Sequence, residues 1–123
     1  MGMLRNLVRS FGYAFEGLLY TLFTQRNARI EVACAAAVLG AAAWLHVSRV
    51  EWAVLLLTIG IVLSAETMNT AIEKIVDLLS PQIQENAKHA KDVAAGAVLI
   101  VSIAAAVIGM VILGPPMWRH LFG

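Results

Sequence analysis

The sequence predicts an all-α membrane protein with three transmembrane helices and an amphipathic N-terminal surface helix. Of its 123 residues, 60% are hydrophobic and only 14% are charged, with a mean hydropathy of +0.79. A soluble domain has roughly 45–50% apolar and about 25% charged residues. Uncharged runs at 32–48, 52–65 and 93–114 alternate with polar segments. At this length we expect one domain, residues 1–123, with too little core to enclose a polar site alone.

Residues 4–22 predict the surface helix. Leucine, valine and phenylalanine recur at the i, i+3, i+4 and i+7 spacing of one helical face, whereas Arg5, Arg9 and Glu16 lie on the other side. Basic residues on the polar face suit a helix in the plane of the membrane interface. The same pattern also fits a helix packed on the cytoplasmic face of the bundle, so both placements stay open.

The first two spans are predicted at 30–48 and 52–70. The first is rich in alanine, which lets helices approach closely in lipid. Residues 48–51 are expected to form a short hairpin between antiparallel helices. The second span continues as a charged helix and is expected to end at Ser80-Pro81, since proline cannot continue the hydrogen-bond ladder.

The third span is predicted at 93–114, which is long enough to cross the membrane with some tilt. Pro115-Pro116 is expected to end it, and Trp118-Arg119-His120 to form a short tail. The polar residues 82–92 separate it from the second span.

Orientation follows from the distribution of lysine and arginine. The positive-inside rule places the side of the bundle that carries most of them in the cytoplasm. That side has Arg5, Arg9, Arg26, Arg29, Lys74, Lys88 and Lys91, against Arg49 and Arg119 on the other. We therefore expect a cytoplasmic N-terminus and an outer C-terminus, with all three tryptophans near the outer interface. The net charge of +1, without a basic patch, argues against nucleic acid as a partner.

The candidate catalytic residues lie at the end of the second span and just after it. Glu66, Asn69, Glu73 and Asp77 fall within an arc of about 80° on a helix. An ionisable residue beside a membrane-type run is a functional hypothesis, because lipid penalises its charge. The alternative is that these residues merely flank a span that has ended.

Carboxylates with a nearby lysine suit a magnesium nucleotide, since hard oxygen ligands hold the ion and the ammonium meets phosphate oxygens. Glu73 is a candidate metal ligand, and Glu66 is a candidate base for an attacking hydroxyl. Lys91-Asp92 begins the third span nearby. The loops of the common soluble kinases are absent from the sequence. Spacing alone leaves a phosphotransferase and a proton- or ion-coupled transporter equally open.

The chain resembles the bacterial diacylglycerol kinase/undecaprenol kinase family over nearly its whole length, and two segments carry the resemblance most specifically. They are Glu66-x-x-Asn69-Thr70-Ala71-Ile72-Glu73-x-x-x-Asp77 and Ala87-Lys88-x-Ala90-Lys91-Asp92-x-Ala94-Ala95-x-Ala97-Val98-Leu99. The start is similar too, with Ser10-Phe11-x-Tyr13-Ala14-x-x-Gly17, Arg26-Asn27 and Glu31. The Arg26-Asn27 pair and the second segment look more like the undecaprenol branch.

The resemblance implies a homotrimer in the bacterial inner membrane, with active sites between subunits that transfer the γ-phosphate of ATP to a lipid alcohol, undecaprenol or diacylglycerol, with Mg²⁺. The resemblance also implies roles for single residues: Glu66 would be the catalytic base and Glu73 a metal ligand. Asn69 and Asp77 would support the site, and Glu31 would lie at its edge. The residues that would contact the nucleotide are Lys91, Asp92, Tyr13 and Arg9. The family often has a second metal-binding glutamate immediately before Arg-Asn, where this chain has Gln25. An uncharged amide there is expected to bind the ion more weakly, or Glu31 or Glu16 substitutes.

Two other classes of function remain open at this stage. One is a small oligomeric transporter in which Glu66 carries a proton, as intramembrane carboxylates do in pumps. That reading leaves the polar residues after Glu66 without a role. The other is a structural membrane subunit, for which Glu66→Gln would change no assayable property.

Overall fold

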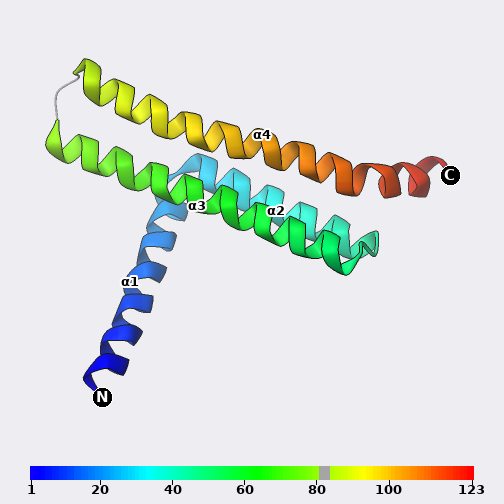
Figure 1. The fold of residues 1–123 in the computed structure, drawn as a ribbon, viewed down its shortest axis with the longest axis horizontal. Helices are drawn as coiled ribbons and strands as arrows, with labels where there is room; N and C mark the ends of the chain where they lie inside the picture. Colours follow the sequence, from blue (N-terminus) through cyan, green and yellow to red (C-terminus); the bar gives the residue numbers. More distant parts are fainter. Residues whose placement is uncertain (81–83) are drawn as a thin grey trace.

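The structure, a computed structural model, describes residues 1–80 and 84–123, and this part of the chain forms α-helices joined by short connections. The helices are α1 (Gly2–Thr24), α2 (Arg26–Trp44), α3 (Arg49–Leu79) and α4 (Glu85–Phe122). Helices α3 and α4 run side by side in opposite directions, and α2 packs against α3 (Figure 1). The all-α prediction is confirmed. Helix α3 ends at Leu79 with Ser80 as its C-cap, whereas Pro81 lies outside the described residues.

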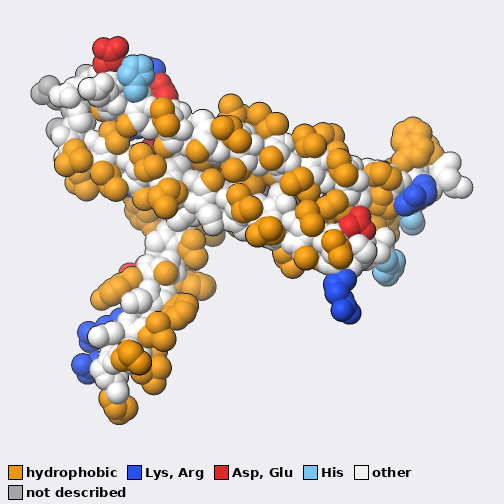
Figure 2. Space-filling view, viewed as in Figure 1, with side chains coloured by type: hydrophobic (Ala, Val, Ile, Leu, Met, Phe, Trp, Pro, Cys, Tyr) orange, Lys and Arg blue, Asp and Glu red, His pale blue; other side chains and the backbone are white. Residues whose placement is uncertain are grey.

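Helix α1 projects away from the other helices, and its last turns contact α2 and α3 (Figure 1). Its buried residue is Thr21, near the C-terminal end. Large apolar side chains are exposed along its length, and basic side chains gather near its N-terminus (Figure 2). The amphipathic pattern therefore forms a real helix whose apolar face finds no cover within the chain, which is what a membrane-surface helix requires.

Helix α2 ends in a Schellman motif. The N–H of His46 donates to the carbonyl of Ala43, and that of Val47 donates to the carbonyl of Ala42, at 3.4 and 3.3 Å. This geometry needs a left-handed residue, and His46 has φ 53° where glycine is usual. Val47 then packs against the buried cluster that contains Ala42.

The hairpin predicted at 48–51 is wrong by about one helical turn, because Arg49–Glu51 already belong to α3. Ser48 and Glu51 form a capping box. The Ser48 hydroxyl accepts from the Glu51 N–H at 3.2 Å, and Glu51 Oε1 accepts from the Ser48 N–H at 3.1 Å. These bonds satisfy two backbone N–H groups at the start of α3, those of Ser48 and Glu51, so the helix begins directly after Ser48.

The predicted stop at Pro115-Pro116 is also wrong, since α4 continues through both prolines to Phe122. Proline removes one ladder hydrogen bond, and long membrane-type helices tolerate that loss when neighbouring groups compensate. Here the final turns are held by contacts: the His120 ring packs edge-on against Trp44, with centroids 4.3 Å apart, and Trp118 contacts Phe122.

Within residues 1–80 and 84–123, α3 and α4 are long and apolar enough to cross a membrane. Helix α2 covers most of the span predicted at 30–48, but it starts with Arg26, Arg29 and Glu31 and does not share that property. A small core cluster of Ala42, Leu55 and Ile112 joins α2, α3 and α4. The rest of the helical surface is largely apolar and exposed (Figure 2), so lipid or further protein must cover it.

Candidate functional site

A buried polar face lies midway along α3, where α1 and α2 meet. Glu66 is 2% exposed, Thr70 3% and Asn69 8%. The helical period puts Glu66, Asn69 and Glu73 on one side, and Asn69 Nδ2 donates to Glu73 Oε1 at 3.4 Å. The Thr70 hydroxyl donates to the backbone carbonyl of Glu66 at 2.9 Å, so Thr70 is satisfied within the helix.

Three buried side-chain oxygens near this face lack a hydrogen-bond partner in the described part of the chain: Glu66 Oε2, Asn69 Oδ1 and Glu31 Oε2. Glu31, on α2, is close enough to Glu66 for their charges to repel, and Glu73 repels Glu66 from about two helical turns further along α3. Buried polar atoms in native proteins nearly always have partners. A substrate hydroxyl or a cation would supply the missing ones.

An apolar cavity of about 350 Å³ adjoins Glu31 and extends between α2, α3 and α4. Glu31 is the charged residue of its lining, which otherwise comprises Cys34, Ala35, Val38, Leu55, Thr58, Ile59, Val62, Leu63, Ser102, Ala105, Ala106 and Gly109. A cavity of about 150 Å³ holds one benzene molecule, so this one has room for on the order of a dozen carbon atoms. A carboxylate therefore stands at one end of a space shaped for an apolar chain.

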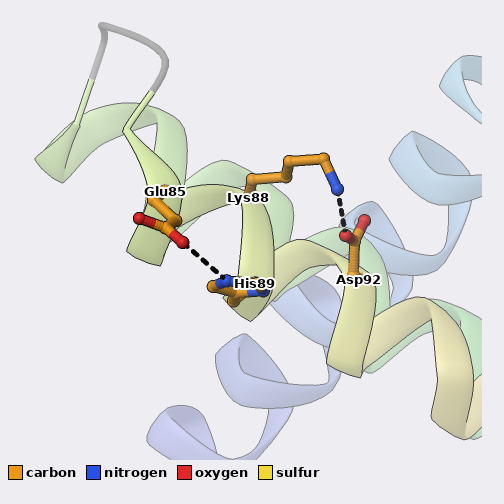
Figure 3. Close-up of polar contacts among 4 residues, drawn as sticks. All are labelled: Glu85, Lys88, His89 and Asp92. Atoms are coloured by element: carbon orange, nitrogen blue, oxygen red, sulfur yellow. Dashed lines mark hydrogen bonds and ion pairs between the residues drawn. The ribbon is translucent and has the colours of Figure 1, made fainter.

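Ion pairs mark the polar end of the α3–α4 pair. Lys91 Nζ donates to Asp77 Oδ1 at 2.5 Å and so joins the two helices. On α4, Lys88 pairs with Asp92 at 2.7 Å, and His89 lies 3.6 Å from Glu85 (Figure 3). Asp92 directly precedes the apolar run 93–114. The hydrogen bond and the charge of Lys88 hold the pKa of Asp92 below its ordinary value.

The predicted site residues are only partly brought together. Glu31, Glu66, Asn69 and Glu73 gather, and Asp77 pairs with Lys91. Asp92 instead pairs with Lys88 on its own helix.

Arg9 and Tyr13 lie on the exposed part of α1, where Tyr13 is 68% exposed. Gln25 joins α1 to α2, and its N–H donates to the carbonyl of Thr21. The described residues of this single chain thus bring neither Arg9 nor Tyr13 into a contact with the buried face.

Sequence reasoning missed two features of the site. Thr70, on the polar face, and Thr21, near the end of α1, are both buried; the position of Thr70, four residues after Glu66, could have indicated its burial. The ammonium of Lys74 lies 5.7 Å from the centre of the Tyr20 ring, a cation–π contact between α3 and α1. No local pattern could have indicated that contact, because it depends on how α1 meets α3.

The donors on this face suit a hard cation. Carboxylate and amide oxygens are the groups that Mg²⁺ accepts in proteins, and Asn69 Oδ1 is a buried example without a partner. Among the described residues, however, no three His, Cys, Asp or Glu side chains gather closely enough to hold a metal ion. The side-chain oxygens of Glu73 and Gln25 are of the type that magnesium accepts, although no hydrogen bond or ion pair among the described residues joins the two side chains.

Comparison with known proteins places the chain in a family. Residues 12–113 match the profile of prokaryotic diacylglycerol kinase. The chain is 48% identical over 113 residues to a diacylglycerol kinase of Synechocystis sp., covering 91% of this chain and 65% of that protein, so it spans just under two thirds of that relative. It is 39% identical to an undecaprenol kinase of Bacillus subtilis, covering 93% of both chains. It is 28% identical to a diacylglycerol kinase of Escherichia coli, covering 94% of this chain and 91% of that protein. The chain therefore belongs to the prokaryotic diacylglycerol kinase family, a family of membrane lipid kinases.

Proposed function

We propose that this protein transfers the γ-phosphate of ATP to the hydroxyl group of a membrane lipid alcohol at the cytoplasmic face of the membrane. The observation that carries the proposal is the unpartnered carboxyl of Glu66, buried near the end of an apolar cavity that begins at Glu31. Membership of a lipid kinase family supports the reaction type. The buried carboxyl and the apolar space supply the two things that a lipid hydroxyl requires.

The apolar chain of the substrate lies in the cavity between α2, α3 and α4. Its hydroxyl group then reaches the carboxyls of Glu31 and Glu66, whose free oxygens accept its hydrogen bond. Asn69, held by Glu73, offers its free oxygen on the same face. Binding of the lipid also removes water from the carboxylates, which strengthens their interactions with the hydroxyl.

Glu66 acts as the general base. It takes the proton of the lipid hydroxyl as the hydroxyl oxygen attacks the γ-phosphorus, and the bond from that phosphorus to the β–γ bridging oxygen breaks to release ADP. Glu31 and Glu73 flank Glu66 closely enough for their charges to act on its carboxyl group.

The nucleotide binds at the polar end of α3 and α4. Lys91 contacts phosphate oxygens, and Asp77 holds its ammonium in place across the helix pair. Asp92 lies one residue further along α4, on the same polar end. Glu73 and Gln25 would hold Mg²⁺, and the ion would supply positive charge to neutralise the phosphates.

The complete site needs more than one copy of the chain. Arg9 and Tyr13 lie exposed on α1, which projects away from the other helices (Figure 1), and this supports a site completed by a neighbouring subunit. A homotrimer in the bacterial inner membrane would also cover part of the exposed apolar surface of α3 and α4. In this arrangement α2 and the turn that follows it complete the third span predicted at 30–48, the N-terminus is cytoplasmic and the C-terminus lies outside.

The test is a radiolabelled ATP assay on purified protein in detergent with magnesium, with undecaprenol and diacylglycerol offered separately. Label in one lipid establishes the activity and identifies the acceptor; from the undecaprenol-like segments of the sequence, we expect undecaprenol. Label in neither lipid, from folded protein, would refute the proposal. Proton flux into liposomes without ATP would then support the transporter that the sequence left open.

A further inference from the structure

A second cavity lies at the opposite end of the bundle from the Asp77–Lys91 pair, where α2 ends and the last turns of α4 pass it (Figure 1). We call it the C-terminal cleft. Its volume is about 560 Å³, and its lining residues are Trp44, Leu45, His46, Pro116, Arg119 and His120. Cationic and imidazole side chains gather over this end of the molecule (Figure 2). The proposed kinase chemistry uses none of them.

His46 occupies its place at a conformational cost. It adopts φ 53° at the end of α2, a left-handed conformation that glycine adopts freely and a histidine side chain disfavours. Backbone strain of this kind concentrates at binding sites, where a strained residue is kept because its side chain has a functional role. The turn itself would form more easily with glycine, so the helix end does not explain why histidine is there.

Two further donors reach the cleft from α4. The His120 ring is fixed against Trp44, with centroids 4.3 Å apart and planes at 69°. Arg119 adjoins it in the last turn of the helix. This placement depends on the continuation of α4 through Pro116, which itself lines the cleft. The cleft therefore presents a guanidinium and two imidazoles, all of which donate N–H hydrogen bonds.

The charge at this end is only partly balanced by acids, since Arg49 and Arg119 face one carboxylate, Glu51, among the described residues nearby. Arg49 lies at the start of α3, and the nearby carboxylate, Glu51, is committed to the capping box with Ser48. A favourable interaction with the α4 dipole accounts for Arg119 and His120 on their own. It accounts neither for the cavity nor for the strained histidine contributed by a different helix.

We propose that the C-terminal cleft binds the phosphate of an anionic phospholipid headgroup at the membrane surface opposite the kinase site. Trp44, which lines the cleft, and Trp118, which precedes Arg119 on α4, are both more than half exposed, and indole rings favour the interface between headgroups and acyl chains. At that depth the available phosphate belongs to lipid. Arg119 pairs with the phosphate, His46 and His120 donate to its oxygens, and Leu45 and Pro116 contact the glycerol and first methylenes.

The test is native mass spectrometry of the full-length protein titrated with phosphatidylglycerol, comparing Arg119→Gln and His120→Gln with Arg49→Gln. The Arg49 variant removes the same charge at the same end of the bundle, but from a residue that does not line the cleft. We expect phosphatidylglycerol to bind about tenfold more weakly to both cleft variants, with no change in the control. Arg119→Lys, which keeps the charge, should restore part of the affinity. Equal weakening in all three glutamine variants, or no weakening in any, would overturn the proposal.

Two further measurements separate the alternatives. Inorganic phosphate at millimolar concentration should not displace the lipid; displacement would show a general anion site and overturn the assignment to a headgroup. His46→Gly should raise the melting temperature, because it relieves the left-handed strain, and at the same time weaken lipid binding. A stabilised variant with unchanged binding would show that His46 does not face a ligand and would contradict the proposal.

Discussion

Replacing Glu66 with glutamine should stabilise the fold while it removes activity. Glu66 is 2% exposed, one of its carboxyl oxygens has no partner, and Glu31 and Glu73 repel its charge. A charged side chain at membrane depth costs roughly 2.5–3.5 kcal/mol on insertion scales. Glu66 lies at the end of the apolar run rather than at its centre, so we expect the neutral amide to recover about 1–3 kcal/mol.

The assay is reversible unfolding in mixed detergent micelles, followed by circular dichroism at neutral pH, on the wild-type protein and the Glu66→Gln variant. Glu85→Gln is the matched control, because Glu85 is 89% exposed and its loss should change stability by less than about 0.5 kcal/mol. A Glu66→Gln variant no more stable than the control would refute the reasoning. It would mean that Glu66 is not a desolvated carboxylate, so that burial of its charge does not lower the stability of the wild-type protein.

Three other predictions concern single side chains. Ser48→Ala removes the N-cap of α3 and should lower stability by about 1 kcal/mol, measured in the same unfolding assay; no change would contradict the capping box. Gln25→Glu should lower the magnesium concentration needed for half-maximal activity, because it adds a charged ligand, and an unchanged titration would argue against a metal role for position 25. Lys88→Gln should raise the pKa of Asp92 toward its ordinary value, read from the carboxyl carbon chemical shift. Because Lys88 lowers that pKa, the pair's contribution to stability is present at neutral pH and lost as pH falls through the lowered pKa; an unshifted titration would show that the pair does not form in solution.

The polar face of α3 could be predicted because it depends on helical periodicity alone. Glu66, Asn69 and Glu73 share a face wherever the helix packs, and the structure confirms that they do. The approach of Glu31 to Glu66 could not be derived in this way, since it depends on how α2 docks on α3. The family resemblance placed Glu31 at the edge of the site, whereas periodicity carried no information about it.

The errors at the helix ends have local physical causes. Residues 48–51 contain the Ser-x-x-Glu pattern of a capping box, which predicts a helix that starts directly after Ser48 rather than a hairpin through these residues. The proline pair was expected to stop α4, but contacts such as that of His120 with Trp44 hold the following turns in place. Such contacts join residues distant in sequence, so no local rule includes them.

The most direct test of the proposed mechanism is the steady-state rate of lipid phosphorylation by Glu66→Gln, measured together with its affinity for magnesium ATP. If Glu66 is the general base, kcat should fall by roughly 10²–10⁴-fold while nucleotide affinity is unchanged, because Glu66 lies on the buried face and the nucleotide residues lie at the polar helix ends. A variant that keeps more than about a tenth of wild-type kcat would contradict the assignment of Glu66 as the base.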